Sequence, residues 1–440
     1  MRMKSLLVRA LPLLAVPYAI AVGCNASTVN SGFTGGSGGT GAAGIGGDVS
    51  TAESSSSGDI GIDASFSDSG GEGGILCTPG GPDDDVDKDG FTPAQGDCDD
   101  CDPNVNPNSL EVPTPNGVTP KDENCNGEVD EVTPIVTCDS DLAIAEMDPL
   151  AAARAVELCK MSTGPLDWGV VSAKWVMADG SAPPTTAPQA ANFHLGHGML
   201  PAFGAIVKVR EGERMLALSS GTARQPTDPG YKSVSGFNKL YEGGNAAGFP
   251  KESPACPGTL TGEPHDPTGV EIVINAPSNA KGFSFDFDFF TFEWPNYVCN
   301  KYNDFFIAIL SPVPMGQTDG NVSFDSMGNP VSVNNALLEV CGCEGNPPNP
   351  CIEGGKVFAC SLGNTDLIGT GFGFDTDYGQ DHGSTGWLQT KAPITPGSQI
   401  TIRWAVYDSG DGSLDTTTLI DNWRWIANAG VDVGTSPIPK

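Results

Sequence analysis

The stretch that decides the fold is residues 282–289, Gly-Phe-Ser-Phe-Asp-Phe-Asp-Phe, in which phenylalanine alternates strictly with serine or aspartate. Successive side chains of a β-strand point to opposite faces, so this spacing predicts four Phe facing inward and the polar residues facing outward. Residues 400–407 alternate in the same way, and short runs at 303–310 and 419–425 are bounded by Gly, Pro, Asn and Asp turns. Many short strands with few helices predict a mainly β fold, an antiparallel β-sandwich of jelly-roll type.

A single short helix is expected at the start of this β domain. Asp148 is a good N-cap, Pro149 suits the first helical position, and residues 150–160 are rich in Ala. Cys159 is expected to pin the end of this helix. Aromatic and β-branched residues become frequent from Cys138 onward, so we place the sandwich at residues 138–430 and a tail at 431–440. Residues 341–360, with four Cys and several Gly and Pro, predict a stapled loop insertion.

The segment before the sandwich, residues 77–137, is an acidic module. It holds fifteen Asp and Glu residues against two Lys, a net charge of −13, and almost no apolar side chains. Such a segment cannot fold on a hydrophobic core, and its carboxylates repel one another. A cation and disulfides are therefore expected to hold it together, in the way that small modules without a core are stapled.

Oxygen-bearing side chains recur at every second position of this module and end at a glycine, in residues 85–90 and again in residues 122–127. Calcium loops are built in this way. The alternative is a solvated acidic linker, the usual fate of a run of like charges. An EF-hand is unlikely, since Gly96 and Thr133 stand where a bidentate Glu is needed. The predicted calcium ligands are Asp85, Asp87, Asp89, Asp97, Asp99, Asp122, Asn124, Asn126 and Asp130.

The module resembles the MopE-type putative metal-binding repeat, which is akin to thrombospondin type 3 calcium repeats. The resemblance implies calcium binding in an extended, disulfide-pinned arm on a bacterial cell surface. This copy has no Cys shortly after Glu111 and carries an additional Cys101, which leaves the partners of Cys98 and Cys125 open. The matching residues are Asp87 to Phe91, Gly96 to Asp100, Asp102, Pro103, Pro107, Glu111 and Asp122 to Glu131.

The first 23 residues are typical of a signal peptide. Basic residues flank the start of an apolar run, 10–22, that is too short to span a membrane. The sequence Ala-Val-Gly-Cys at 21–24 resembles a bacterial lipobox, which implies cleavage before Cys24 and its lipidation. The alternative is an ordinary secretory signal with an incidental Cys. Residues 24–76 are rich in Gly and Ser and predict a disordered tether, so the protein would be lipid-anchored in the bacterial envelope, at the outer membrane or cell surface.

The net charge of −32 makes nucleic acid and anionic membrane surfaces poor partners, whereas divalent cations suit it. Of the thirteen Cys, a lipidated Cys24 leaves an even number, and cysteines of an exported chain are expected to form disulfides. The disulfide candidates are Cys77, Cys98, Cys101, Cys125, Cys138, Cys159, Cys256, Cys299, Cys341, Cys343, Cys351 and Cys360.

Residues 275–425 resemble the choice-of-anchor L domain of bacterial surface proteins, with residues 138–274 as a companion part of the same unit. The resemblance implies an extracellular β-sandwich, without a known ligand or enzymatic activity. It rests on Phe283 to Phe287, Phe290 to Pro295, Asn303 to Phe305, Val331 to Asn335, Thr385 to Leu388, Tyr407 to Asp415 and Leu419 to Trp425.

A second calcium site is expected in the sandwich. Asp421 shares its strand face with Leu419, Trp423 and Trp425 and therefore needs a metal or an Arg, such as Arg403 or Arg424. The alternative is an Asp-Gly turn with one buried salt bridge. Glu293, Asn303 and Asp304 form a further oxygen-rich cluster near strand ends. The predicted ligands are Asp408, Asp411, Asp415 and Asp421.

Enzyme signatures are weak. His194 and His197 lack the Glu of a zinc protease motif and are expected at the surface, and Asp381, His382 and Ser384 are too close in sequence for a triad. The sequence therefore predicts a non-enzymatic, calcium-binding cell-surface lipoprotein that presents a β-sandwich to a glycan, an envelope component or a protein partner.

Two alternative functions remain. One is a lipid-anchored glycan hydrolase, whose mark would be two carboxylates facing each other in a deep cleft. The other is a transition-metal protein that binds copper, because MopE-type proteins are associated with that metal. Only four His and no His/Met cluster make such soft-metal sites a poor fit.

Overall fold

The computed structural model describes residues 77–131, 137–334, 337–342, 351–427 and 430–439. All of these residues fall within one unit, Gly74–Lys440. The predicted signal peptide, the tether, Cys24 and Cys343 lie outside the described residues.

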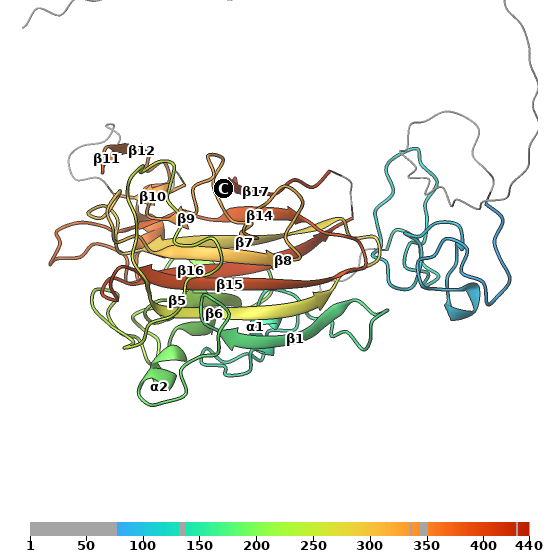
Figure 1. The fold of residues 1–440 in the computed structure, drawn as a ribbon, viewed down its shortest axis with the longest axis horizontal. Helices are drawn as coiled ribbons and strands as arrows, with labels where there is room; N and C mark the ends of the chain where they lie inside the picture. Colours follow the sequence, from blue (N-terminus) through green and yellow to red (C-terminus); the bar gives the residue numbers. More distant parts are fainter. Residues whose placement is uncertain (1–76, 132–136, 335–336, 343–350, 428–429, 440) are drawn as a thin grey trace, which may run out of the picture. The chain divides into compact units, whose positions relative to one another are not determined.

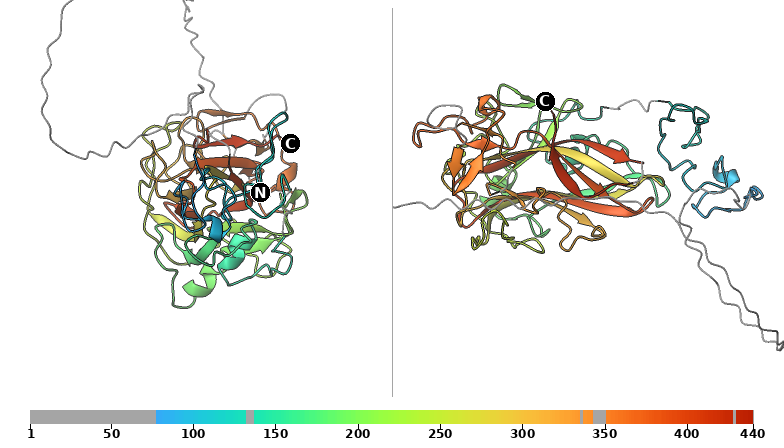
Figure 2. Two further views of the ribbon diagram at one scale, coloured as in Figure 1. Left: turned by 90° about the vertical axis from the view of Figure 1, so that its right-hand side faces the viewer. Right: turned by 90° about the horizontal axis from the view of Figure 1, so that it is seen from above.

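Two antiparallel sheets face each other as layers (Figures 1 and 2). One sheet has the strand order β1-β6-β15-β8-β9, and the other has the order β10-β13-β7-β16-β5-β2, with β14 joining β7 to β17. This confirms the predicted antiparallel β-sandwich. The strands of the first sheet are β1 Gly169–Val176, β6 Pro264–Asn275, β8 Phe305–Ser311, β9 Val331–Ser332 and β15 Gln399–Ser409. Those of the second are β2 His197–Leu200, β5 Met215–Ser219, β7 Gly282–Thr291, β10 Val340–Cys341, β13 Gly383–Ser384, β14 Leu388–Pro393, β16 Thr416–Ile426 and β17 Gly434–Pro437.

Smaller elements complete the fold. The hairpin of β11 and β12 lies inside the predicted loop insertion, and the C-terminal residues expected to form a tail supply β17, which pairs with β14. These elements are β3 Ala202–Phe203, β4 Val207–Lys208, β11 Cys351–Glu353, β12 Lys356–Phe358, α1 Leu150–Arg154, α2 Gln189–Phe193 and the 3₁₀ turns Pro93–Gln95 and Thr365–Leu367.

The alternating stretch forms β7, and its four phenylalanines face the main core between the sheets. Phe285 packs against Trp404 of β15, and Phe287 packs against Phe306 of β8. The intervening polar residues lie on the opposite face, as predicted, but this face is covered as well, because all ten residues of β7 are buried. Strands β14 and β16 flank β7. On its second face, Asp286 accepts hydrogen bonds from Gln389 of β14, Asn422 of β16 and Arg210 of a neighbouring loop.

The predicted helix at 150–160 is shorter than expected. Helix α1 ends at Arg154, and Glu157 adopts a left-handed conformation with φ of +66° that stops the helix. Asp148 still caps it, because its carboxylate accepts a hydrogen bond from Leu150 N at 3.0 Å. The single-helix prediction also missed α2, whose five residues are too few for a helical pattern to be visible in the sequence.

Five disulfides join ten of the candidate cysteines in the described part of the chain. Cys138–Cys159 ties the segment after α1 to the start of the domain, and Cys341–Cys360 closes the loop insertion. Cys351 is also disulfide-bonded. The pairing left open by the sequence is settled as Cys98–Cys125, with Cys77–Cys101 beside it and Cys256–Cys299 in the sandwich.

Candidate functional site

The acidic arm, residues 77–137, contains a loop that gathers three predicted ligands. One carboxylate oxygen each of Asp85, Asp87 and Asp89 lies within 4.8 Å of the others. Gly90 follows with φ of +96°, a conformation that glycine adopts at little cost, and so makes the sharp turn that the spacing predicted. The alternate spacing therefore brings three hard oxygen ligands to one point.

Backbone N–H groups hold these carboxylates in place. Asp85 accepts a hydrogen bond from Gly90 N, Asp87 accepts one from Asp89 N, and Asp89 accepts one from Phe91 N. Asp100 accepts hydrogen bonds from Gly80 N and Val86 N and so braces the start of the loop. No spacing pattern in the sequence indicates this bracing role of Asp100.

The second loop repeats the hydrogen bonds of the first. Asp122 accepts from Gly127 N, Asn124 accepts from Asn126 N, and Asn126 accepts from Glu128 N, at the same spacings as in the first loop. Gly127 has φ of +90°, close to that of Gly90. The two segments are thus one structural repeat.

The second loop recruits a different acid from the one predicted. Glu131 accepts hydrogen bonds from the side-chain amides of Asn124 and Asn126, at 2.8 and 2.5 Å. Asp130 instead accepts from Thr114 N, while its own N–H donates to Glu111. Sequence spacing does not distinguish two adjacent acids, so Asp130 remains a predicted ligand, with Glu131 as the acid that contacts Asn124 and Asn126.

Asp97 lies beside the first loop, whereas Asp99 does not. Asp97 interacts with Asp85, Asp87 and Asp89, and its side chain is 94% buried. Asp99 lies 3.8 Å from the ammonium of Lys121, which also contacts Asp102 at 2.7 Å. Of these two predicted ligands, the structure therefore places Asp97 beside the first loop and Asp99 beside Lys121.

Several carboxylate oxygens of the arm are buried without a hydrogen-bond partner among the described residues: Oδ2 of Asp87, Oδ2 of Asp97, Oε2 of Glu111 and Oε2 of Glu131. Burial, together with the carboxylates of Asp89, Asp97 and Asp85, raises the pKa of Asp87 to about 6. Burial also raises the pKa of Asp89 and of Asp97. Oxygens in this state are short of a positive partner, which fits a hard cation such as calcium.

The four ligands predicted in the sandwich do not form one site. Asp421 lies with Glu157, and its oxygens accept hydrogen bonds from Arg210 N at 2.6 Å and Asn422 N at 2.7 Å. Neither predicted arginine contacts it, because Arg403 binds Glu271 and Arg424 binds Glu211. Burial raises the pKa of Asp421 to about 7, and burial together with Asp421 raises that of Glu157 to about 9.

A β-bulge explains why the strand-face prediction for Asp421 is wrong. The pairing of β16 with β7 shifts between Asp421 and Arg424, and Asn422 adopts φ of +57°. The extra residue moves Trp423 into the main core, where its ring stacks on Phe283 at 4.2 Å, while Leu419 packs in a separate cluster on the other face.

The other three predicted ligands lie at one end of the sandwich. Asp408 and Asp415 are fully buried there and interact with Asp304, which was predicted to belong to a separate cluster with Glu293. Asp411 is less buried, and its carboxylate accepts a hydrogen bond from Ser413 N. The structure therefore merges the two clusters that the sequence kept apart.

The histidines are structural. His197 is fully buried, stacks on Trp175 at 3.8 Å and bonds to His194, so the expectation of a surface position is wrong. Burial lowers the pKa of both rings. His382 stacks on Phe292 and pairs with the Trp294 carbonyl oxygen, and the Ser384 hydroxyl accepts from Gly386 N instead.

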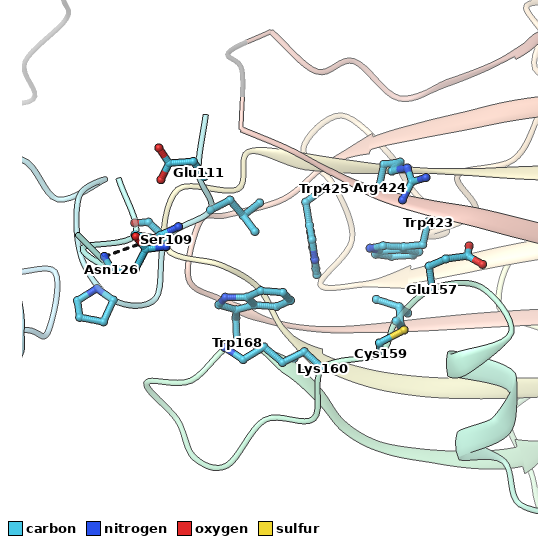
Figure 3. Close-up of a pocket in the computed structure, with 15 residues that line it drawn as sticks. Ser109, Glu111, Asn126, Glu157, Cys159, Lys160, Trp168, Trp423, Arg424 and Trp425 are labelled. Carbon is cyan, nitrogen blue, oxygen red and sulfur yellow. Dashed lines mark hydrogen bonds between the residues drawn. The ribbon is translucent and has the colours of Figure 1, made fainter. Parts of the chain in front are cut away.

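A pocket of about 560 Å³ is lined by residues of the arm and of the sandwich. Figure 3 shows Trp168, Trp425 and Trp423 in a row along it, with Glu111 and Glu157 at opposite ends. Glu157 accepts a hydrogen bond from Asn422 N and interacts with Asp421, whereas Glu111 accepts from Asp130 N. The two carboxylates do not face each other as the glycan hydrolase alternative requires.

Fold and sites together define a disulfide-bonded antiparallel β-sandwich preceded by an acidic arm. Residues 259–423 match the choice-of-anchor L domain family, a stretch that runs from the loop before β6 to Trp423 in β16. Choice-of-anchor domains are typically associated with the cell surface, and the family is not an enzyme family. No curated protein and no solved structure matches the chain. No helix in the described ranges has the length and apolar character needed to cross a membrane.

Proposed function

We propose that the protein is a non-enzymatic, calcium-binding surface lipoprotein whose sandwich meets a partner outside the cell. The choice-of-anchor L match supports the surface association and the sandwich. The lipobox-like segment at Cys24 supports attachment to the bacterial envelope through lipid. The acidic arm then serves as the spacer between the membrane tether and the sandwich.

One observation carries the calcium part of the proposal. Asp85, Asp87 and Asp89 place three carboxylate oxygens within 4.8 Å of one another, beside an unpartnered buried oxygen of Asp97. Carboxylates so close together repel unless they are protonated or share a cation, and calcium takes six to eight oxygen ligands of this kind. The second loop, with Asp122, Asn124 and Asn126, offers fewer charges and is expected to bind more weakly.

Calcium would change the mechanics of the arm. The arm has two disulfides and many local hydrogen bonds but few buried apolar residues, among them Val105. Binding of the ion cancels the repulsion within each loop and favours the folded arm over its unfolded forms by mass action, about 2.7 kcal/mol at a calcium concentration one hundred times Kd.

The partner would bind the sandwich side of the molecule. The pocket lined by Trp168, Trp423 and Trp425 is the described cavity best suited to a glycan, since aromatic rings supply large, stiff contact area. Adhesion to a glycan, an envelope component or another protein is thus the proposed role. We do not propose copper binding, because the His197 ring stacks on Trp175 and its Nε2 pairs with His194 Nδ1.

Calorimetric titration of the purified full-length protein with calcium tests this function. We compare the wild type with Asp85→Asn/Asp87→Asn/Asp89→Asn and with a control of equal charge change, Asp83→Asn/Asp84→Asn/Glu128→Gln. The proposal requires the first variant to lose at least one bound ion per chain and the control to keep the wild-type number. Equal binding by both variants would show that the arm is a plain charged linker.

A further inference from the structure

The sandwich contains a group of buried acidic side chains that is separate from the carboxylates of the arm. Five buried acids gather at the end of the sandwich where β7 ends, β8 and β16 begin and β15 ends: Asp266, Glu293, Asp304, Asp408 and Asp415, hereafter the sandwich acid cluster. Each of the five is at most 3% exposed. All five fall inside residues 259–423, the stretch that matches the choice-of-anchor L family.

The buried positive charge beside the cluster does not balance it. Lys239 is fully buried and interacts with Asp266, Asp408 and Asp415. Its ammonium, however, donates hydrogen bonds to the Ser219 carbonyl at 2.9 Å and to the Thr268 hydroxyl at 2.6 Å rather than to a carboxylate. Five acids and one lysine leave up to four negative charges in a region where an isolated charge is costly.

Three members of the cluster accept hydrogen bonds, whereas Asp408 and Asp415 have unpartnered oxygens. Glu293 accepts one from Asp304 N at 3.2 Å. Asp304 accepts hydrogen bonds from Ser409 N and the Thr416 hydroxyl, and Asp266 accepts them from Lys239 N and Tyr241 N. Donors of this kind orient a carboxylate while leaving its remaining lone pairs free for a ligand.

Asp415 points to a ligand independently of the cluster's charge. It is 0% exposed, and neither of its carboxylate oxygens has a hydrogen-bond partner among the described residues. Its Oδ2 fills the space beside Gly221, where an added Cβ would lie 1.6 Å from it. The side-chain oxygen of Asn303 is likewise buried without a partner, in a residue adjacent to Asp304.

Asp304, Asp408 and Asp415 interact pairwise. Asp304 and Asp408 repel each other as like charges, and neither carboxylate oxygen of Asp408 has a hydrogen-bond partner among the described residues. Asp415 interacts with both of them. Buried carboxylate oxygens that repel one another and have no donor are short of a positive partner, which a hard cation would supply.

We propose that Asp408 and Asp415, with the side-chain oxygen of Asn303, bind a hard divalent cation of the calcium type inside the sandwich, because these are the members of the cluster region whose buried oxygens have no hydrogen-bond partner among the described residues. No three carboxylates of this group meet the 4.8 Å limit satisfied by Asp85, Asp87 and Asp89. At most two carboxylates of the cluster therefore ligate the same ion, and neutral oxygens such as Oδ1 of Asn303 complete the ligand set, as they do in many calcium sites. The ion would tie the loops before β8 and β16 to the end of β15, so this site fixes the sandwich rather than the arm.

The test uses calcium and the full-length protein, with bound ions counted after dialysis. The Asp85→Asn/Asp87→Asn/Asp89→Asn variant must retain at least one bound calcium ion per chain. Asp408→Asn must bind one ion fewer than the wild type. Asp286→Asn is the matched control, because Asp286 is equally buried but has three side-chain donors, and it must keep the wild-type number.

Thermal melts distinguish the cation site from a purely structural acid. Asp415→Asn removes an uncompensated buried charge, so in chelator its melting temperature should equal or exceed that of the wild type, and its gain on adding calcium should be smaller. If the Asp408→Asn variant does not fold, the Asp415→Asn variant takes its place in the ion count. The proposal is overturned if the arm variant binds no calcium at all, or if Asp408→Asn and Asp415→Asn bind as many ions as the wild type. An arm variant that loses no ion counts against the function of the arm alone.

Discussion

The acidic arm and the β-sandwich place negative charge in opposite ways. The arm keeps its carboxylates on short loops at or near the surface, each held by backbone N–H groups a few residues away. The sandwich encloses its acids completely and joins them to strands distant in sequence. The arm accommodates many carboxylates because it has few buried apolar residues that a charge could destabilise. The sandwich tolerates it because a large aromatic core supplies stability elsewhere.

The largest expected effect is the loss of free energy of unfolding when a core side chain of the sandwich is truncated, since the arm has no comparable core. Phe287→Ala removes a fully buried ring that contacts Phe285 and Phe306, and should lower the free energy of unfolding of the sandwich by about 3–5 kcal/mol. Urea denaturation followed by tryptophan fluorescence measures this loss. Phe374→Ala, at a Phe that is 64% exposed, is the control and should change little. A loss below about 1 kcal/mol at Phe287 would contradict the core assignment.

The next effect concerns the arm alone. Cys98→Ser/Cys125→Ser opens a bridge between residues 27 positions apart and should destabilise the arm by about 3 kcal/mol. Limited proteolysis should then cut within residues 77–131 while the melting temperature of the sandwich stays unchanged. A parallel fall in the melting temperature would mean that arm and sandwich unfold together, and the comparison would fail.

A smaller effect tests the buried pair Glu157 and Asp421, which faces Asp139, Asn422 and the backbone of Arg210 and Glu211. The folded pKa of Glu157, about 9, lies above the ordinary value for a glutamate, so the folded state holds more protons than the unfolded state. Stability is therefore greatest near pH 4 to 5 and falls as pH rises toward 9. Glu157→Gln should flatten this slope and stabilise the protein at pH 8, on the order of 1–3 kcal/mol.

Denaturation at pH 5 and pH 8 measures the slope. The exposed Glu128→Gln serves as the control for loss of a carboxylate. A wild-type stability that rises between pH 5 and pH 8, with an unchanged slope in Glu157→Gln, would show that the pair is charged and well compensated.

The smallest effect is at the surface of the arm. Lys121 contacts Asp102 at 2.7 Å and Asp99 at 3.8 Å, with its own side chain half exposed. Lys121→Gln should cost less than about 0.5 kcal/mol and should lose that effect in high salt. Proteolytic protection of the arm at low and high ionic strength measures it. A loss comparable to that of the disulfide variant would make this ion pair a main support of the arm.

The sequence predicted those features that depend on local spacing. Alternating Phe residues indicated β7 and its core face, and the Asp-x-Asp-x-Asp-Gly pattern indicated a loop that the structure builds at residues 85–90. Such features need only the period of a strand or the reach of an Asx turn.

The remaining features depend on contacts that no local pattern contains. The bulge at Asn422 moves Trp423 to the other face, and regular pairing with β7 from Thr416 to Asp421 carries Asp421 along the strand away from Asp415. Asp304 joins Asp408 only because β8 pairs with β15. Arg210 and Gln389, which are far from β7 in sequence, likewise cover the outer face of this strand.

The local hydrogen bonds of the two arm loops also bear on the order of folding. Each loop closes through bonds that span two to five residues, whereas the pairing of β6 with β15 brings together residues 124 positions apart. Contacts of short span form fast, and long-range pairing of strands is slow. If calcium binds the arm after export, we expect the arm loops to close before the strands of the sandwich have paired. The arm loops would thus be closed before the edges of the sandwich strands are paired.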